Sequence, residues 1–478
     1  MLYNFIAHEP AVGHLARERF ACGGAGFYVA EQTTAMNRFL ARPSCSRAGP
    51  PERPRVGVLC PRPRAEVSLP GDLPVRYFDP AQGSLDELAE LYPRDARWLE
   101  RVDRELGSSV PIAHHLVAAR VALALERPFL CAFHSVWPAV RAFLSPGEVD
   151  GRARLAEDIL RKADGILVAT RAERDLMLRS AASETLRERL ARVVHVAPGG
   201  VNPHLEALAR QRRTPWLRRF WRRALLPGVP LHAQVFYTVG RFVAHKNQLS
   251  VLRAFLAVAS ELPNAHLLMV GPPDDLGYVA SIRHTLESAP AALRARIVLT
   301  GPQPIEAAHL AGDVLVHASS SEAWGRVIDE AFVLGNPTLV AALPMLAEKA
   351  GYRWRELPGG AGPRSGAPAA RPRFAYEPRD DAAEERSLLV DPGNVASIAT
   401  ALARAGSDAR WRRQCHLYNR RVASEWSWSR RVQRLLAIWS RAEERANGVP
   451  AFPEAPAATA MRPSPLPTAR GRRRAAFR

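Results

Sequence analysis

The sequence predicts an α/β protein of two domains, each with a parallel sheet covered by helices on both faces. The chain has 478 residues, and at about 150 residues per domain this length suggests two or three domains. Hydrophobic residues make up 47% and charged residues 24% of the chain, which is ordinary globular usage and argues against a fibrous or wholly disordered protein. In the second half, short apolar strands alternate with helical segments through short connections, a pattern typical of parallel sheets.

The first half opens with a strand, a helix and a second strand, and then continues the same alternation less regularly. A Pro198-Gly199-Gly200 turn ends the series, so we assign residues 1–205 to a first Rossmann-like domain. The predicted elements are a strand at 1–7, a helix at 27–40, a strand at 55–60, a helical stretch at 84–127, an apolar run at 128–133, a helix at 155–162 and a strand at 165–169.

The second half is the most regular part of the chain, and we assign residues 231–425 to a second Rossmann-like domain. Its predicted strands lie at 235–239, 266–270, 296–299, 314–317, 338–341 and 387–390. Its predicted helices lie at 247–261, 279–288, 305–311, 327–334, 396–405 and 409–424. A last helix is predicted within residues 426–446.

Three segments fall outside this pattern. Residues 206–230 are predicted to be a basic linker, with seven arginines between positions 210 and 223 interleaved with Trp216, Phe220 and Trp221. Those aromatic rings either pack on neighbouring elements, or form an interfacial patch that touches anionic lipid headgroups, or contact nucleic acid. Residues 355–385 are rich in Pro, Gly and Arg and predict a mobile insertion, and residues 447–478 predict a disordered basic tail.

Charge and cysteine content narrow the class of protein. The net charge is +19, which favours anionic partners without choosing among nucleic acid, an acidic membrane face and phosphorylated substrates. Five cysteines with no C-x-x-C pair argue against a disulfide scaffold or a zinc ribbon and favour a reducing compartment. We recognise neither a signal peptide nor a spanning helix, so we expect a cytoplasmic protein, with a peripheral position at the inner face of the membrane left open.

The sharpest motif is the segment from Ser321 to Glu330, which joins a predicted strand to the helix that follows it. Glu322 falls in the loop and Glu330 in the helix, at the carboxyl end of a parallel strand, where open α/β sheets bind ligands. Backbone N–H groups near Gly325, Arg326 and Val327 are predicted to bind a pyrophosphate at the helix N-terminus. The distance between the two glutamates along this segment suits a nucleotide sugar that lies across the helix N-terminus. One glutamate is then predicted to hold sugar hydroxyls and the other ribose hydroxyls. Two glutamates at this spacing also arise by chance in helical sequences, and Arg326 either meets a phosphate or faces solvent.

A second motif places two cations at the same sheet edge. Gly240 and Arg241 follow a predicted strand, and Lys246 precedes the next helix. An arginine fork and a lysine point charge together suit a departing diphosphate, although both residue types are abundant in this chain and could simply be solvated.

These motifs resemble the retaining GT-B glycosyltransferases of family 4, which transfer a sugar from a nucleotide diphosphate sugar. The resemblance rests on Gly240, Arg241, Lys246, the Glu322 to Glu330 block and the Leu388-Leu389-Val390-Asp391-Pro392-Gly393 segment, and covers most of residues 230–440. It implies two Rossmann-like domains that face each other across a cleft, with the last helix crossing back to the first domain. The first half is similar more loosely, through Gly23 and Gly24 in a Gly-rich segment and through His134 after an apolar run.

The resemblance implies a role for each matched residue. Arg241 and Lys246 would stabilise the diphosphate, Glu322 would orient the donor sugar, Glu330 would hold the ribose, and His134 would reach the reacting centre. Gly23, Gly24, Gly240, Ala323, Trp324, Gly325, Arg326 and Val327 would complete the donor site. Ala323 and Asn247 stand where the family frequently has glycine, and the insertion after Trp354 is unusual. We expect no protein nucleophile, no bound metal and no cofactor, with the nucleotide diphosphate sugar as substrate.

We therefore predict a hexosyltransferase with a saccharide or lipid-linked acceptor, acting in cell-envelope or exopolysaccharide synthesis. A sugar phosphorylase or an NDP-sugar epimerase on the same frame remains an alternative. A basic nucleic-acid-binding protein is a further alternative from another class, although the sequence carries no helix-turn-helix, zinc-finger or RNP-like signature.

Overall fold

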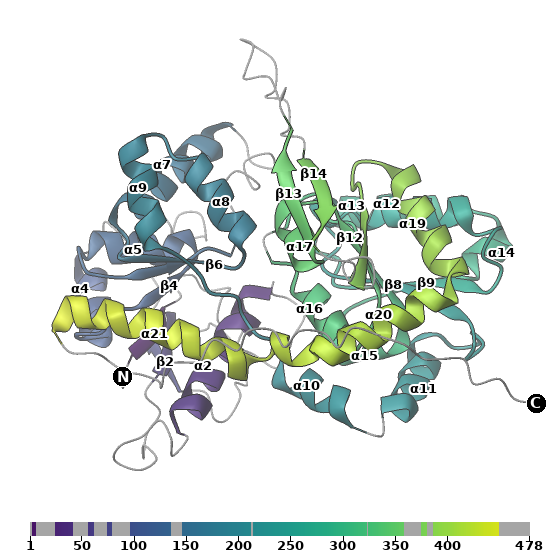
Figure 1. Cartoon of the computed structure of the whole chain (residues 1–478), viewed down its shortest axis with the longest axis horizontal. Coiled ribbons are helices and arrows are strands. Elements are labelled where there is room, and N and C mark those ends of the chain that lie inside the picture. Colours follow the sequence, from purple (N-terminus) through teal and green to yellow (C-terminus); the bar gives the residue numbers. More distant parts are fainter. Residues whose placement is uncertain are drawn as a thin grey trace, which may run out of the picture.

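The protein folds into two α/β domains that lie next to each other (Figure 1). The computed structural model describes residues 2–5, 24–41, 56–61, 74–78, 96–134, 146–211, 214–322, 324–357, 374–379 and 386–448. The predicted fold class, two Rossmann-like domains with a final helix that returns to the first, is confirmed by these residues.

The first domain is a parallel sheet with helices packed against it. Its strands are β1 (Leu2–Phe5), β2 (Val56–Pro61), β3 (Val75–Phe78), β4 (Ile112–His114), β5 (Leu130–Ala132), β6 (Gly165–Val168) and β7 (Val194–Val196). Its helices are α2 (Gly24–Leu40), α4 (Ala96–Leu106), α5 (His115–Ala124), α7 (Pro146–Lys162), α8 (Arg171–Arg179) and α9 (Glu184–Val193). The strands pair in the order β3-β2-β1-β4-β5-β6-β7, so the winding direction reverses between β1 and β4.

The second domain repeats this plan. Its sheet strands are β8 (Gln234–Val239), β9 (Ala265–Val270), β10 (Ile297–Thr300), β11 (Val314–His317), β12 (Thr338–Ala341) and β15 (Ser387–Val390). Its helices are η4 (Ala244–Lys246), α12 (Gln248–Val258), α13 (Leu276–Glu287), α14 (Ala291–Arg294), α15 (Ile305–Ala311), α16 (Arg326–Val333), α17 (Pro344–Lys349), α19 (Val395–Ser407) and α20 (Ala409–Val422). The strand order β10-β9-β8-β11-β12-β15 places the reversal between β8 and β11.

Apolar strand residues of the second domain divide between the two faces of its sheet. Phe236 and Leu267 pack in one core, which α12 and α19 cover, whereas Tyr237 and Leu268 pack in a second core with α15 and α16. Burial of both faces explains why these strands are apolar throughout rather than alternating with polar residues.

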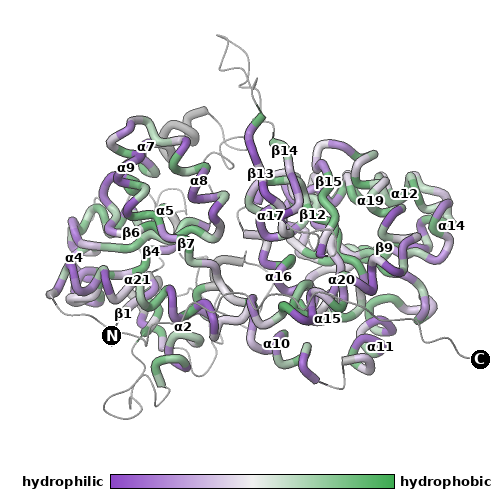
Figure 2. The backbone as a smooth tube through the Cα atoms, in the orientation of Figure 1, coloured by the Kyte–Doolittle hydropathy of each residue, from purple (hydrophilic) through white to green (hydrophobic). Residues whose placement is uncertain are grey.

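Helix α21 (Trp428–Asn447) crosses back from the second domain and packs against α2 of the first domain (Figure 1). The indole N–H of Trp439 donates to the Val110 carbonyl at 2.7 Å, and the Glu443 carboxylate accepts from the Val110 N–H at 2.6 Å. Hydrophobic and hydrophilic residues alternate along α21 in Figure 2, as expected of a helix with one buried face. The predicted tail beyond Gly448 lies outside the described residues.

The segment predicted as a basic linker is helical and belongs to the second domain. It contains α11 (Thr214–Leu225), which follows α10 (Pro203–Arg210). Arg222 donates to the carbonyls of Ala311 and Ala233, both at 3.0 Å, and pairs with Asp313 at 2.7 Å. This segment is thus helical, and Arg222 faces inward and binds groups at the end of α15 and at the starts of β8 and β11.

The segment predicted as a mobile insertion at 355–385 includes the end of one strand and the whole of a second. Strands β13 (Tyr352–Glu356) and β14 (Phe374–Pro378) pair antiparallel, and the ring of Trp354 lies edge-on to Phe374, with centroids 5.5 Å apart. An alternation of aromatic and charged or small residues along both strands signals this hairpin in the sequence. Residues 358–373 and 380–385 lie outside the described residues.

A second contact between the domains lies where α17 meets the N-terminus of α8. The Glu348 carboxylate of α17 accepts from the backbone N–H groups of Arg171 at 3.3 Å and Ala172 at 2.6 Å. An acidic side chain is favourable at this end of a helix, because the helix dipole leaves partial positive charge there. The first residues of α8 are therefore held by a side chain of the other domain.

We expect Glu173→Gln to stabilise the protein at alkaline pH and to change little near pH 5. Glu173 is fully buried in α8, and burial raises the pKa of its carboxyl from 4.5 to about 8, against the hydrogen bond from the Ala169 N–H. The folded protein thus keeps a proton that the unfolded chain releases. The stability from this group is complete below about pH 4.5 and is lost as the pH rises through about 8.

Thermal unfolding of wild type and variant across this pH range measures the effect. The exposed Glu188→Gln on α9 serves as the matched control. Parallel stability curves for wild type and Glu173→Gln would show that this carboxyl does not hold its proton on folding.

Candidate active site

The candidate site lies at the reversal of strand order in the second sheet. Open α/β sheets bind ligands at the carboxyl ends of the strands on either side of such a point. Lys246 lies in η4, in the connection after β8, and Glu322 lies in the loop after β11. The two predicted residues therefore come from the two strands that flank the reversal.

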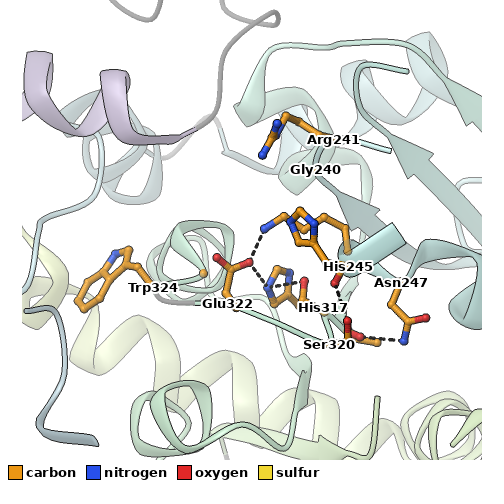
Figure 3. Close-up of polar contacts among 12 residues, drawn as sticks. Gly240, Arg241, His245, Asn247, His317, Ser320, Glu322 and Trp324 are labelled. Atoms are coloured by element: carbon orange, nitrogen blue, oxygen red, sulfur yellow. Dashed lines mark hydrogen bonds and ion pairs between the residues drawn. The ribbon is translucent and has the colours of Figure 1, made fainter. Parts of the chain in front are cut away.

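Lys246 and Glu322 meet directly. The Lys246 ammonium group binds the Glu322 Oε2 atom, and the Nε2 atom of His317 approaches the same oxygen at 3.2 Å (Figure 3). Side-chain exposure is 19% for Lys246 and 15% for Glu322, so water screens this pair only partly. An ammonium group has three N–H donors, so the bond to Glu322 uses one of them.

The charge state of this cluster follows from its contacts. Burial would raise the pKa of Glu322, but the Lys246 charge and the hydrogen bond from His317 hold that pKa well below its usual value. Burial lowers the pKa of His317, so its ring is neutral at pH 7 and donates from Nε2. The site thus holds an ionised carboxylate beside one fixed cation, an arrangement that can accept hydrogen bonds from hydroxyl groups and neutralise an anion.

Asn247 fixes the backbone that presents Lys246. Its φ of 61° lies in the left-handed region, which asparagine tolerates better than most residues. This explains how asparagine can stand where the family that the sequence resembles frequently has glycine. Its side-chain amide donates to the carbonyls of Ala318 at 3.0 Å and Pro392 at 2.7 Å. Three loops at the carboxyl edge of the sheet are thereby tied together.

Gly240 and Arg241 lie at the end of β8. Gly240 has a φ of 151°, and its carbonyl oxygen would be only 1.9 Å from a Cβ atom on Gly271, so the two loops approach closely. Arg241 pairs with Asp274 at 3.2 Å, and its side chain is 42% exposed. Arg241 and Lys246 therefore both lie in the connection after β8, but Arg241 pairs with a separate carboxylate.

The predicted anion site at the start of α16 has the expected backbone but an unexpected arginine. Gly325 precedes the helix with a φ of 56° and provides no side-chain cap, so Arg326 and Val327 form the first turn. The Arg326 guanidinium binds Glu31 of α2 at 2.7 Å and lies 3.8 Å from Glu330. The sequence predicted that Arg326 meets either a donor phosphate or solvent. In the structure it binds a carboxylate of the first domain instead of facing solvent. Ala323 lies outside the described residues.

Glu330 is held in a chain of buried polar groups. The Asn336 amide donates to the Tyr237 hydroxyl at 2.9 Å, the hydroxyl donates to His309 Nδ1 at 2.7 Å, and His309 Nε2 faces Glu330 at 3.4 Å. Because Nδ1 accepts, the ring proton lies on Nε2, toward the carboxylate. Burial would raise the pKa of Glu330, but this hydrogen bond and the Arg326 charge hold it below its usual value.

Trp324 and the loop before α16 are held by a buried lysine. The Lys349 ammonium group lies 3.8 Å from the centroid of the Trp324 ring and binds the carbonyl of the same residue. It also donates to the Gly325 carbonyl at 3.3 Å and pairs with Asp329 at 3.0 Å. One cation thus fixes two backbone groups next to Glu322.

His134 follows β5 at the carboxyl edge of the first sheet. Its Nε2 atom lies 2.9 Å from His114 Nδ1, and His114 Nε2 lies 3.1 Å from the Asn4 Oδ1 atom. Since that oxygen also accepts from Gln32, His114 donates to it and accepts from His134. Gly24 is the first residue of α2, and Gly23 lies outside the described residues.

Sequence reasoning missed several residues of this network, among them His317, Lys349, Glu31 and His309. His317 is the last residue of an apolar strand, a position that already pointed to the sheet edge. The other three come from distant segments, and no local pattern connects them to the motifs. Within the described part of the chain, no group of three His, Cys, Asp or Glu side chains could hold a metal ion.

The part of the chain that forms this site is similar to known glycosyltransferases. Residues 227–351, which include Lys246, Glu322 and Glu330, match the family model for Glycosyl transferases group 1. The chain is 27% identical over 296 residues to the D-inositol 3-phosphate glycosyltransferase of Kineococcus radiotolerans. These findings support a group 1 glycosyltransferase. That alignment covers 59% of this chain and 63% of the relative, less than two thirds of its length.

The whole fold is similar to solved glycosyltransferase-type structures. The sucrose-phosphate synthase of Thermosynechococcus elongatus matches with a TM-score of 0.68 at 17% identity, covering 92% of this chain and 99% of that one. The Anabaena protein HepE, solved in complex with UDP and glucose, matches with a TM-score of 0.61 at 16% identity, covering 92% and 100%. At such identities the likeness establishes the GT-B arrangement and leaves the substrate to be argued from the site.

Proposed function

We propose that the protein is a retaining glycosyltransferase of family 4, which moves a hexose-type sugar from a nucleotide diphosphate sugar to a saccharide or lipid-linked acceptor. Cell-envelope or exopolysaccharide synthesis is the process that this activity would serve. The observation that carries the proposal is the Lys246 and Glu322 pair at the reversal of the second sheet, with Glu330 further along the same strand-loop-helix unit. The group 1 match over this unit supports it.

Each group has a place in the proposed reaction. Glu322 accepts hydrogen bonds from sugar hydroxyls, Glu330 accepts them from the ribose, and the amides at the start of α16 bind the diphosphate. Lys246, with Arg241 beside it, stabilises the negative charge of the leaving diphosphate. The bond from the sugar C1 to the phosphate oxygen breaks and a bond from C1 to the acceptor oxygen forms on the same face. The acceptor proton passes to the departing phosphate.

Titration calorimetry with UDP, GDP, ADP and their common sugars tests the donor site. We expect one diphosphate to bind, and Glu330→Ala to weaken it about 10- to 100-fold, because the ribose hydroxyls lose a charged acceptor. The HepE structure with UDP and glucose makes the uridine series the first to measure. The exposed Glu287→Ala on α13 is the matched control and should bind as wild type does.

The result that would contradict the proposal is equal nucleotide affinity in wild type and Glu330→Ala, or no binding across the panel. Release of a sugar phosphate with inorganic phosphate as acceptor would point to a phosphorylase. Conversion of the nucleotide sugar without any acceptor would point to an epimerase.

A further inference from the structure

Helix α11 displays two large aromatic side chains to solvent. Trp216 is 57% and Phe220 is 47% exposed, and their rings stack with centroids 5.7 Å apart and planes 15° from parallel. Across the described residues, five large hydrophobic side chains are exposed. Trp216 and Phe220 are two of them, and Leu231, which follows this helix in the sequence, is another. The two stacked rings form one exposed apolar patch, and such a patch indicates a binding surface.

The opposite face of α11 anchors it firmly. Besides the bonds of Arg222 described above, Arg218 donates to the carbonyls of Gly312 at 3.3 Å and Leu334 at 3.2 Å, and to the Asn336 side chain at 2.6 Å. Two inward arginines one turn apart therefore hold the helix against the second domain. The stacked aromatic pair sits on a fixed scaffold rather than on a loop.

The exposed face around these rings is basic. Arg219 and Arg223 are exposed on the same helix as Trp216 and Phe220, and the α11 sequence contains no Asp or Glu. Arg420 of α20 is also exposed beside α10, where it donates to the Ala209 carbonyl at 2.8 Å. An apolar pair set among cations matches the boundary between headgroups and acyl chains of an anionic bilayer.

We propose that α11 is the surface by which this protein binds an anionic lipid membrane. Trp216 and Phe220 enter the headgroup region as one apolar unit, and Arg219 and Arg223 contact lipid phosphates. This inference does not depend on the proposed reaction, because lipid binding is measured without a sugar donor. No helix in the described part of the chain has the length and apolarity needed to span a bilayer, so binding would be peripheral.

Charge selects the membrane over other occupants of this surface. A second copy of the chain carries the same net charge of +19, and the chain's own residues 449–478 contain six arginines and a single acidic residue. Both would bring cations to a basic face. A single-stranded nucleic acid would offer phosphates, but it binds aromatic side chains by stacking separate bases on them, and here the two rings already stack on each other.

Vesicle flotation tests the proposal with the full-length protein. Wild type should float with phosphatidylcholine vesicles that contain a third phosphatidylglycerol and should remain unbound with phosphatidylcholine alone. Trp216→Ser with Phe220→Ser, and separately Arg219→Gln with Arg223→Gln, should each weaken binding about 10-fold or more. The matched control is Leu276→Ser, which changes an exposed apolar side chain on α13 and should float as wild type does.

Several outcomes would overturn the proposal. These are failure of the wild type to float with anionic vesicles, equal flotation with neutral vesicles, or unchanged flotation of the aromatic variant. Salt-sensitive binding to DNA without vesicle binding would assign the basic face to nucleic acid, and a dimer lost in the aromatic variant would assign it to a second copy. Unchanged thermal unfolding of the exposed-residue variants separates a loss of lipid binding from a loss of folding.

Discussion

Lys246→Met is expected to lower the rate of sugar transfer about 100- to 1000-fold, with a smaller effect on donor affinity. The ammonium group lies beside the Glu322 carboxylate at the edge where the diphosphate would depart, so its charge acts most strongly when the leaving group becomes negative. Initial rates at saturating donor measure kcat, and calorimetry measures affinity. The exposed Arg283→Met on α13 removes a cation of the same domain and should leave both unchanged.

The same variant should change the pH profile in a defined direction. Lys246 is the strongest influence that holds the pKa of Glu322 down against burial. Without it the pKa rises, so the acidic limb of kcat/KM should move to higher pH in Lys246→Met. A variant with wild-type kcat, or with lost activity but an unmoved acidic limb, would show that Lys246 does not act through charge at this site.

The sequence was sufficient for the second domain because its strands and helices alternate regularly. In the first domain it was not, because β4 lies inside the stretch predicted as helical at 84–127, and β3 and β7 were not predicted. Strands such as β8 and β11 are short apolar runs next to clear helices, and connections between parallel strands leave few possible topologies. The same regularity predicts that Lys246 and Glu322 lie at one sheet edge. That these two side chains bind each other could not be predicted, since it depends on how two loops of different length converge.

Other parts of the site depend on contacts between distant segments. Arg326 binds Glu31 of the other domain, about three hundred positions away in the chain. The spacing of motifs within one domain cannot predict such a pair. The inward position of two arginines of α11 could not be predicted for a related reason. Arginine in a basic stretch is usually solvated. Here Arg218 and Arg222 have partners because the backbone carbonyls at and after the end of α15 lie next to α11.

Lys349→Met is expected to cost about 3–5 kcal/mol of folding free energy, the largest stability effect of any single change at the site. Side-chain exposure is 2% for both Lys349 and Asp329, so the variant leaves a buried carboxylate without its cation. Burial lowers the pKa of Lys349 to about 8, which still leaves the ammonium form dominant at neutral pH. Denaturant unfolding measures the loss, and the exposed Lys162→Met on α7 should unfold as wild type does.

The double variant Lys349→Met with Asp329→Asn separates two roles of this lysine. Removing both charges should restore most of the stability, because no unpaired ion remains buried. Nucleotide affinity should be reduced in the single and the double variant alike, because in both the carbonyls of Trp324 and Gly325 lack the donor that fixes the loop beside Glu322. If the double variant regained affinity together with stability, Lys349 would serve the fold alone. If the double variant regained neither stability nor affinity, the conformation of the loop beside Glu322 would depend on the charged pair of Lys349 and Asp329.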